Sequence, residues 1–468
     1  MNISIKAVTL VAGPLLAVLI YFYAVNSGSA EPDHALAITA AVATLCVVWW
    51  IFEPIPIPVT SLLPLAVFQM SGVLTEKEVG ESYGNSLILL LLGGLILSRV
   101  MERSGAHLRL ALFMVNLFGK NSSKRLVLGF MVTSATLSMW ISNTATTLIL
   151  LPVALAVTGQ AKDPELAAPL MMSIAFAASI GGIGTPIGTP PNLVLMQVYE
   201  QQFNNTISFT EWMSWGVPVV LIMIPMTWLW LTRKLTYSGG FEMPPVGRWS
   251  AIEKRVMMVF ALTAAAWIFR KEPWGGWSEW LDLPAANDGS VALAAVIASF
   301  IIPAGKTGEM HKADKLIDWE TAAAIPWGIL LLFGGGLALA KAFSVSGLSN
   351  ALAGNLSGLS ALPVGLMVFA VCLGVTFLTE TTSNTATTVL LMPLLAAIAM
   401  GSNIDPKLLM VPAAISASCA FMMPVATAPN SIVYASGFFS AKTMAREGFV
   451  LNIFGAVLIA GLCYAILT

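Results

Sequence analysis

Apolar stretches long enough to cross a membrane recur along the whole chain, and short polar segments separate them. The uncharged runs 35–52 and 449–468 approach the ~20 residues that a helix needs to span the hydrocarbon core of a bilayer. This pattern predicts an all-α polytopic membrane protein with about 11 transmembrane helices. The predicted crossings are 8–25, 35–52, 56–72, 84–102, 167–201, 212–232, 255–270, 290–304, 321–341, 408–436 and 448–467.

Two further apolar stretches have a different design. A polar hexapeptide, SNTATT, stands near the centre of each, at residues 142–147 and 383–388. It leaves arms of about 15 residues, which are short for a crossing. Polar backbone at membrane depth is tolerated only where protein or water surrounds it. We therefore predict two re-entrant helical hairpins, about 124–158 and about 363–400, with the hexapeptide at each tip.

The two hexapeptides belong to a longer internal match at a nearly constant offset. Ser104-Gly105 pairs with Ser346-Gly347 at an offset of 242, and GTPPN at 188–192 pairs with ATAPN at 426–430 at an offset of 238. Matches in the same order indicate two structural repeats. The predicted organisation is an extra N-terminal helix at 1–33, a first repeat at 34–235, a cytoplasmic linker at 236–254 and a second repeat at 255–468.

The positions of lysine and arginine predict the orientation, because cytoplasmic loops of membrane proteins are enriched in both. With the N-terminus in the cytoplasm, basic residues gather on the cytoplasmic side, and five predicted crossings separate the hairpins. That odd number makes the repeats inverted, so the hairpins enter from opposite faces. Glycine and proline interrupt 167–201 and 408–436, which we predict to be broken helices. The expected location is the cell (inner) membrane, multi-pass.

Composition agrees with a membrane protein and excludes an ordinary soluble domain. The chain is 57% hydrophobic and 10% charged, against roughly 25% charged in soluble domains. A net charge of -1 gives no reason to expect a nucleic-acid partner. The four cysteines, Cys46, Cys372, Cys419 and Cys463, lie in apolar surroundings without metal-ligand spacing. They are predicted to be buried thiols, with no disulfide or zinc site.

The hexapeptides carry the candidate chemistry. Ser, Asn and Thr ahead of an apolar helix are good N-cap residues, which is the structural alternative to a binding role. Capping explains one polar residue per tip and leaves the repetition unexplained. A helix N-terminus also attracts anions, and unwound carbonyl groups beside it can hold sodium. Pro190 and Pro191, or Pro429, are expected to start the second half of each broken helix.

Together the motifs resemble the divalent-anion:sodium symporter (DASS) family, the INDY-type dicarboxylate transporters. The resemblance rests on the doubled SNT, on TETT before the second copy, on the two T-x-P-N breaks and on WWIFEPIPIPVTSLLPL at 49–65. It implies that the substrate is bound by Ser142, Asn143, Thr144, Ser383, Asn384, Thr385 and Thr427, with Thr189 added by repeat symmetry. It implies one sodium site of Ser138, Ser142, Asn143 and Gly188, and another of Thr379, Thr382, Asn384 and Ala426.

The same resemblance implies sodium-coupled symport of C4-dicarboxylates by a homodimer in the lipid membrane. Each protomer would have a scaffold domain and a transport domain that moves as an elevator, and at least two sodium ions would bind. The alternative is a dicarboxylate/tricarboxylate exchanger of the same fold without obligatory sodium. No enzyme is expected, because dispersed histidines and unpaired carboxylates offer no convergent acid and base. Glu380, whose repeat mate is Met139, is expected to cap backbone or to pair nearby.

Overall fold

The computed structural model describes residues 5–26, 33–118, 122–160, 163, 165–237, 241, 247–271, 276–305, 315–356 and 362–468. Helices dominate these residues, and an isolated bridge between Pro303 and Lys315 is the β-type pairing found among them. Three of the basic residues predicted to be cytoplasmic, Lys120, Lys306 and Lys312, and residues 238–240 and 242–246 of the 236–254 linker lie outside the described residues. The predicted all-α fold class is confirmed.

The helices of the N-terminal part end at the hexapeptides and breaks that the sequence predicts. They are α1 (Ile5–Asn26), α2 (His34–Phe52), α3 (Ile57–Thr60), α4 (Leu62–Met70), α5 (Glu76–Tyr83), α6 (Ser86–Ser104), α7 (Ala106–Phe118), α8 (Ser123–Ser138), α9 (Asn143–Gln160), α10 (Ala167–Gly182), α11 (Pro190–Phe203) and α12 (Phe209–Leu231). The first hexapeptide thus joins α8 to α9, and the first break separates α10 from α11.

The C-terminal part repeats this order. It comprises α13 (Ala251–Ile268), α14 (Gly276–Trp280), α15 (Asp288–Ile301), α16 (Trp319–Ala323), α17 (Trp327–Val345), α18 (Leu348–Leu356), α19 (Val364–Leu378), α20 (Asn384–Gly401), α21 (Lys407–Ala417), α22 (Ala428–Tyr434) and α23 (Ala441–Leu467). By the sequence offset, α6 to α12 correspond in order to α17 to α23. The second hexapeptide joins α19 to α20, and the second break separates α21 from α22.

Local sequence explains where several helices begin and end. Ser208 and Glu211 form a capping box at α12, as Ser250 and Glu253 do at α13, so exposed N–H groups at both starts are satisfied. The chain leaves α2 at Glu53, which adopts a left-handed conformation (φ 46°) immediately before Pro54. A residue before proline is disfavoured in a helix, which explains this boundary.

Seven helices in the described part of the chain are long and apolar enough to cross a membrane. These spans are Ile5–Asn26, His34–Phe52, Glu76–Ser104, Phe209–Leu231, Trp327–Val345, Asn384–Gly401 and Ala441–Leu467. Shorter apolar helices include one arm of each hairpin, α9 and α19, and the first halves of the broken helices, α10 and α21. The eleven crossings and the re-entrant course of the hairpins remain predictions.

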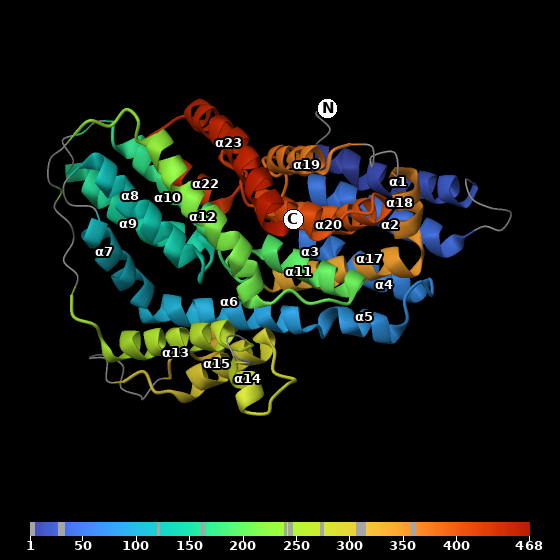
Figure 1. Cartoon of the computed structure of the whole chain (residues 1–468), viewed down its shortest axis with the longest axis horizontal. Helices are drawn as coiled ribbons and strands as arrows, with labels where there is room; N and C mark the ends of the chain where they lie inside the picture. Colours follow the sequence, from blue (N-terminus) through green and yellow to red (C-terminus); the bar gives the residue numbers. More distant parts are fainter. Residues whose placement is uncertain are drawn as a thin grey trace.

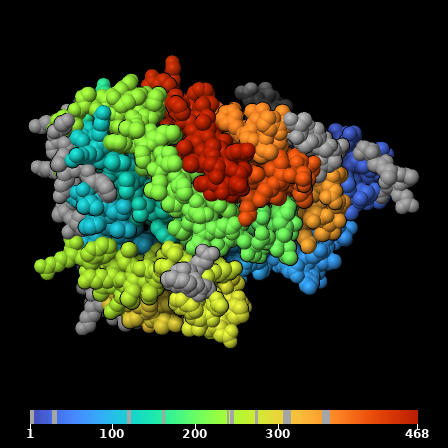
Figure 2. All heavy atoms as spheres, viewed as in Figure 1, coloured from blue at the N-terminus to red at the C-terminus, as the bar shows by residue number. Residues whose placement is uncertain are grey.

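The two repeats interlock at their hairpins and breaks. Helix α9 packs against α22 of the other repeat, and α20 packs against α11. Helix α10 is buried from Leu170 to Gly182, and Phe176 on it stacks near Phe421 with ring centroids 5.0 Å apart. Helices α13, α14 and α15 lie on the opposite side of α6 from this interlocked centre (Figure 1). They form the yellow flank of the surface, which borders α12 and lies away from α23 (Figure 2).

Candidate functional site

Both hexapeptides and both breaks line one cavity of about 970 Å³. All eight candidate substrate residues line it: Ser142, Asn143, Thr144, Thr189, Ser383, Asn384, Thr385 and Thr427. Gly188, Thr382 and Ala426 line it too, whereas the predicted sodium ligands Ser138 and Thr379 lie behind the wall. The fold therefore gathers, from segments more than two hundred residues apart, the groups that sequence reasoning selected.

The first half-site, between α9 and the first break, is a compact group of oxygens. Ser138 Oγ donates a hydrogen bond of 2.5 Å to Asn143 Oδ1. A methyl group added to Gly182 would lie 2.8 Å from Asn143 Oδ1 and 3.1 Å from Gly188 O. These two oxygens therefore converge on the side of Gly182 that lacks a side chain. The absence of a Cβ there allows Asn143, Gly188 and Thr189 to approach Gly182 closely.

The second half-site repeats this arrangement with small changes. Thr379 Oγ1 replaces the serine hydroxyl and donates to Asn384 Oδ1 at 2.6 Å, and also to Ala417 O at 2.9 Å. Thr382 Oγ1 lies 2.6 Å from Thr387 Oγ1. The position that corresponds to Gly182, at the offset of 238, is Ala420. The hydroxyl-to-amide contact is thus common to both half-sites.

Helix capping accounts for only part of the polar tips. Ser142 Oγ accepts from Ala145 N at 3.2 Å, and Thr427 Oγ1 accepts from Asn430 N at 3.2 Å. The corresponding residues Ser383 and Thr189 stand at the N-cap positions of α20 and α11, but their side chains make no cap hydrogen bond. The predicted capping role of the hexapeptides is confirmed at Ser142 and wrong at Ser383. Two hydroxyl groups in the cavity wall are therefore free of a capping role.

Two asparagines that sequence reasoning did not select hold the breaks in shape. Asn192 Nδ2 donates to Gly182 O at 3.0 Å and to Thr185 O at 2.8 Å. Asn430 Nδ2 donates to the corresponding carbonyls of Ala420 and Met423, at 2.9 and 3.1 Å. Each amide satisfies carbonyl groups that the interruption of a helix would leave unpaired. The signal was present in the sequence, because both asparagines end the repeated T-x-P-N motif.

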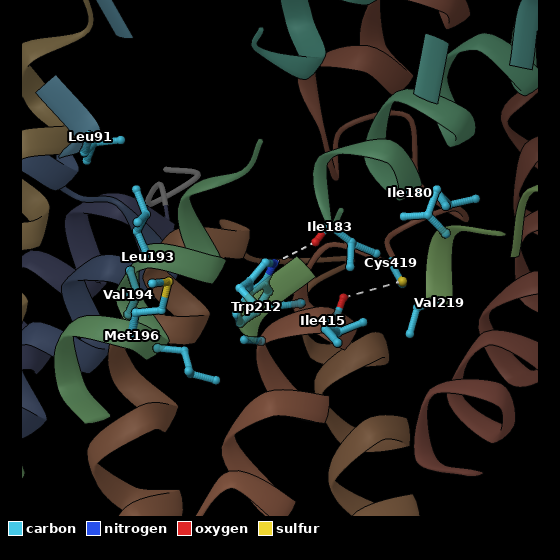
Figure 3. Close-up of a cluster of buried hydrophobic side chains, with 14 of the residues drawn as sticks. Leu91, Ile180, Ile183, Leu193, Val194, Met196, Trp212, Val219, Ile415 and Cys419 are labelled. Atoms are coloured by element: carbon cyan, nitrogen blue, oxygen red, sulfur yellow. Dashed lines mark hydrogen bonds between the residues drawn. The ribbon is translucent and has the colours of Figure 1, made fainter. Parts of the chain in front are cut away.

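Further side chains fix each break to its neighbours. In the first repeat, Trp212 Nε1 donates to Ile183 O at 2.8 Å (Figure 3), and Thr185 Oγ1 donates to Met139 O at 2.5 Å. In the second repeat, Glu380 accepts from the N–H groups of residues 421–423. The expectation that Glu380 caps backbone is confirmed by these contacts.

The cavity continues from the tips toward a charged mouth. One face of α6 lines it along its length, with Leu91 and Leu95 near the tips and Arg99 and Glu102 at the mouth. Arg99 binds Glu102 Oε2 at 2.8 Å and Ala324 O at 2.6 Å. Lys6 and Glu53 also line the mouth, which therefore carries two positive and two negative side chains.

As metal ligands, the oxygen atoms of the two half-sites suit an alkali or alkaline-earth cation better than a transition metal. The described residues contain no group of three or more His, Cys, Asp or Glu that could hold a metal. Hydroxyl, amide and carbonyl oxygens are hard ligands, and those of Ser138, Asn143 and Gly188 lie close together near Gly182. The four cysteines are free and buried, as predicted.

Comparison with known proteins gives a consistent result. A family model described as Citrate transporter (CitMHS) matches residues 47–410. The chain is 40% identical to the sodium-dependent dicarboxylate transporter SdcS of Staphylococcus aureus (strain bovine RF122 / ET3-1) over 99% of this chain and 91% of that protein. It is 40% identical to SdcS of Staphylococcus saprophyticus over 98% of this chain and 91% of that protein.

Two solved structures share the fold at low sequence identity. The Alcanivorax borkumensis YdaH transporter aligns with a TM-score of 0.62 and 15% identity, covering 97% of each chain. Neisseria gonorrhoeae MtrF, described as one of a class of antimetabolite efflux pumps, aligns with a TM-score of 0.58 and 12% identity over 85% of this chain and 83% of its own. The family match and the near-complete alignment with SdcS show that this chain belongs to the divalent-anion:sodium symporter family, a family of membrane transporters and not of enzymes.

Proposed function

We propose that this protein is a secondary active transporter that carries a C4-dicarboxylate together with sodium ions across the inner membrane. The observation that carries the proposal is the single cavity into which both hexapeptides and both breaks project. The relatives named sodium-dependent dicarboxylate transporter support the substrate and the coupling ion. The homodimer, the lipid contacts and the cytoplasmic N-terminus belong to the proposal as well.

The cavity supports binding of a small dianion. Helices α9, α11 and α20 begin at its wall, so their N-terminal N–H groups and dipoles favour negative charge there. The tips contribute hydroxyl and amide groups but no lysine or arginine. Bound sodium ions would then offset the charge of the dicarboxylate, with one ion at each half-site. The assigned substrate and sodium residues are those gathered at the tips.

Sodium would act by completing the anion site. In each half-site the asparagine that faces the cavity also accepts a hydrogen bond from the hydroxyl behind it. A sodium ion among these oxygens would fix the asparagine and the start of the returning helix in one geometry. Coupling of this kind is reciprocal, so the substrate must raise the affinity for sodium by the same factor. Movement of the tips past a fixed scaffold would then carry ion and substrate together.

Labelled succinate uptake into proteoliposomes, with sodium, lithium or potassium outside, tests this function. We expect uptake to require sodium, and both Asn143→Ala and Asn384→Ala to lose at least ~90% of it, because each removes a charge-dipole contact worth ~1.5–3 kcal/mol. Asn350→Ala, on the exposed side of α18, is the matched control and should transport normally. Sodium-independent uptake that requires counter-substrate would identify an exchanger instead.

A further inference from the structure

Glu380 is a buried carboxylate beside the second half-site. It is 3% exposed, it borders the cavity, and none of the ion pairs in the described part of the chain includes it. A charge buried without an ion pair requires strong hydrogen-bond donors around it. The donors that it has are main-chain and amide groups.

Four N–H donors surround this carboxylate. Oε1 accepts from Phe421 N at 2.7 Å, Met422 N at 2.8 Å and Asn452 Nδ2 at 2.7 Å, and Oε2 accepts from Met423 N at 2.9 Å. Three consecutive N–H groups of the second break therefore point at one anion. Glu380 thus joins the turn before the second tip, the second break and α23 into a single unit.

The first repeat fixes its break without any charge. Met139, the repeat mate of Glu380, offers only its main-chain oxygen, which accepts from Thr185 Oγ1. Ile183, the mate of Phe421, likewise uses its carbonyl, which accepts from Trp212 Nε1 (Figure 3). The polarity of the contacts is reversed between repeats. Carbonyls of the first repeat accept from neutral side chains, whereas amides of the second repeat donate to a carboxylate.

One close packing contact is common to both breaks and does not explain this difference. A methyl group on Gly216 of α12 would lie 2.4 Å from Ile183 O, and one on Gly448 of α23 would lie 2.1 Å from Phe421 O. In both repeats a glycine of the following helix presses against the same position of the break. The charge of Glu380 is therefore an addition to a common scaffold.

We propose that Glu380 is a positioning residue whose negative charge fixes the second break and makes the second half-site the stronger of the two sodium sites. The inference rests on the proposed sodium-coupled function. Glu380 adjoins Thr379 and lies two residues before Thr382, both assigned to that site. A carboxylate near a cation inside a protein attracts it with little screening. Its hydrogen bonds hold residues 421–423, which lead to Ala426 and Thr427.

The test is sodium binding to purified protein without substrate, read as the rise in melting temperature with sodium concentration. We expect Glu380→Gln to raise the half-saturating sodium concentration roughly tenfold or more, because the attraction of the carboxylate is lost. The succinate KM at saturating sodium should change much less. Glu380→Asp keeps the charge and should retain most of the sodium affinity, with a larger effect on succinate KM because the break shifts.

Two comparisons make the result decisive. Glu253→Gln removes another buried carboxylate, which is bonded to Arg109 and does not line the cavity, and should leave sodium affinity unchanged. Thr185→Val removes the neutral contact of the first break and should affect sodium less than Glu380→Gln. Equal sodium affinity of Glu380→Gln and wild type would overturn the inference. Absence of sodium-driven uptake in wild type would instead overturn the proposed function.

If Glu380→Gln does not fold, Glu380→Asp carries the test. That variant must then show reduced substrate affinity with preserved sodium affinity.

Discussion

At the scale of single residues, Gly182 separates the two half-sites most clearly. Its missing Cβ allows Asn143 Oδ1 and Gly188 O to approach closely, whereas its mate Ala420 already carries a methyl group. We expect Gly182→Ala to raise half-saturating sodium roughly tenfold or more, since overpacking costs ~1–3 kcal/mol. Sodium-dependent uptake and sodium-induced thermal stabilisation both measure this. Gly159→Ala, where a methyl group meets open space, is the control.

Loss of the fold in Gly182→Ala would show as a melting temperature that no longer responds to any ligand. Normal sodium affinity in a folded Gly182→Ala protein would contradict the assignment of the first sodium site. The sequence predicted Asn143 and Gly188 through the family motif but gave no sign of Gly182, because its role depends on the approach of two segments. Such a contact becomes visible only when α10 and the break are placed together.

At the scale of elements, Gly105 and Gly347 have the geometry of hinges between two helices. Both glycines have left-handed backbones, with φ of 71° and 73°, and nothing lies within 4 Å of the position of an added Cβ. They join α6 to α7 and α17 to α18, and α7 and α18 then pack on the hairpin helices α8 and α20. If the hairpins move relative to α6 and α17, the chain bends at these residues.

Substitution by alanine tests the hinges. Gly105→Ala and Gly347→Ala should each cost ~1–2 kcal/mol where the backbone is left-handed, so each should lower the melting temperature and slow succinate turnover. Sodium affinity should remain unchanged, because neither glycine lines the cavity. Gly461→Ala, inside α23 with open space around it, is the control. The double variant that combines Gly105→Ala with Gly347→Ala tests both positions together. Succinate turnover at the wild-type rate in this variant would contradict a hinge at these positions.

The sequence predicted the elements well and their contacts poorly. The hexapeptides and the T-x-P-N motifs mark the helix ends at 138–143, 378–384, 182–190 and 417–428, because polar residues, glycine and proline interrupt helices locally. The exchange of partners, with α9 against α22 and α20 against α11, has no local signal. The same is true of Glu380, whose donors lie 41 to 43 residues away along the chain and 72 residues away on α23.

At the scale of the whole molecule, one pair of corresponding helices is packed differently in the two repeats. Helix α17 packs along α11, but the corresponding pair, α6 and α22, is separated by the cavity, which both helices line. The mouth residues Lys6, Glu53 and Arg99 all lie at or near ends of helices that the charge distribution predicts to be cytoplasmic. The predicted inverted symmetry then implies a second state in which α6 closes on α22 and α17 parts from α11.

This second state predicts alternating exposure of two equivalent leucines. Leu95 lines the cavity, whereas its repeat mate Leu337 on α17 is 3% exposed. With Leu95→Cys, a membrane-impermeant maleimide should react from the cytoplasmic side, and sodium with succinate should slow that reaction. With Leu337→Cys, reaction should occur only from the outer side and only when sodium and succinate allow turnover. The four native cysteines are buried, so the parent protein is the unlabelled control. If α17 stays packed on α11 throughout the transport cycle, Leu337→Cys will remain unreactive during active transport. That result would exclude a second state in which α6 packs on α22 and α17 parts from α11.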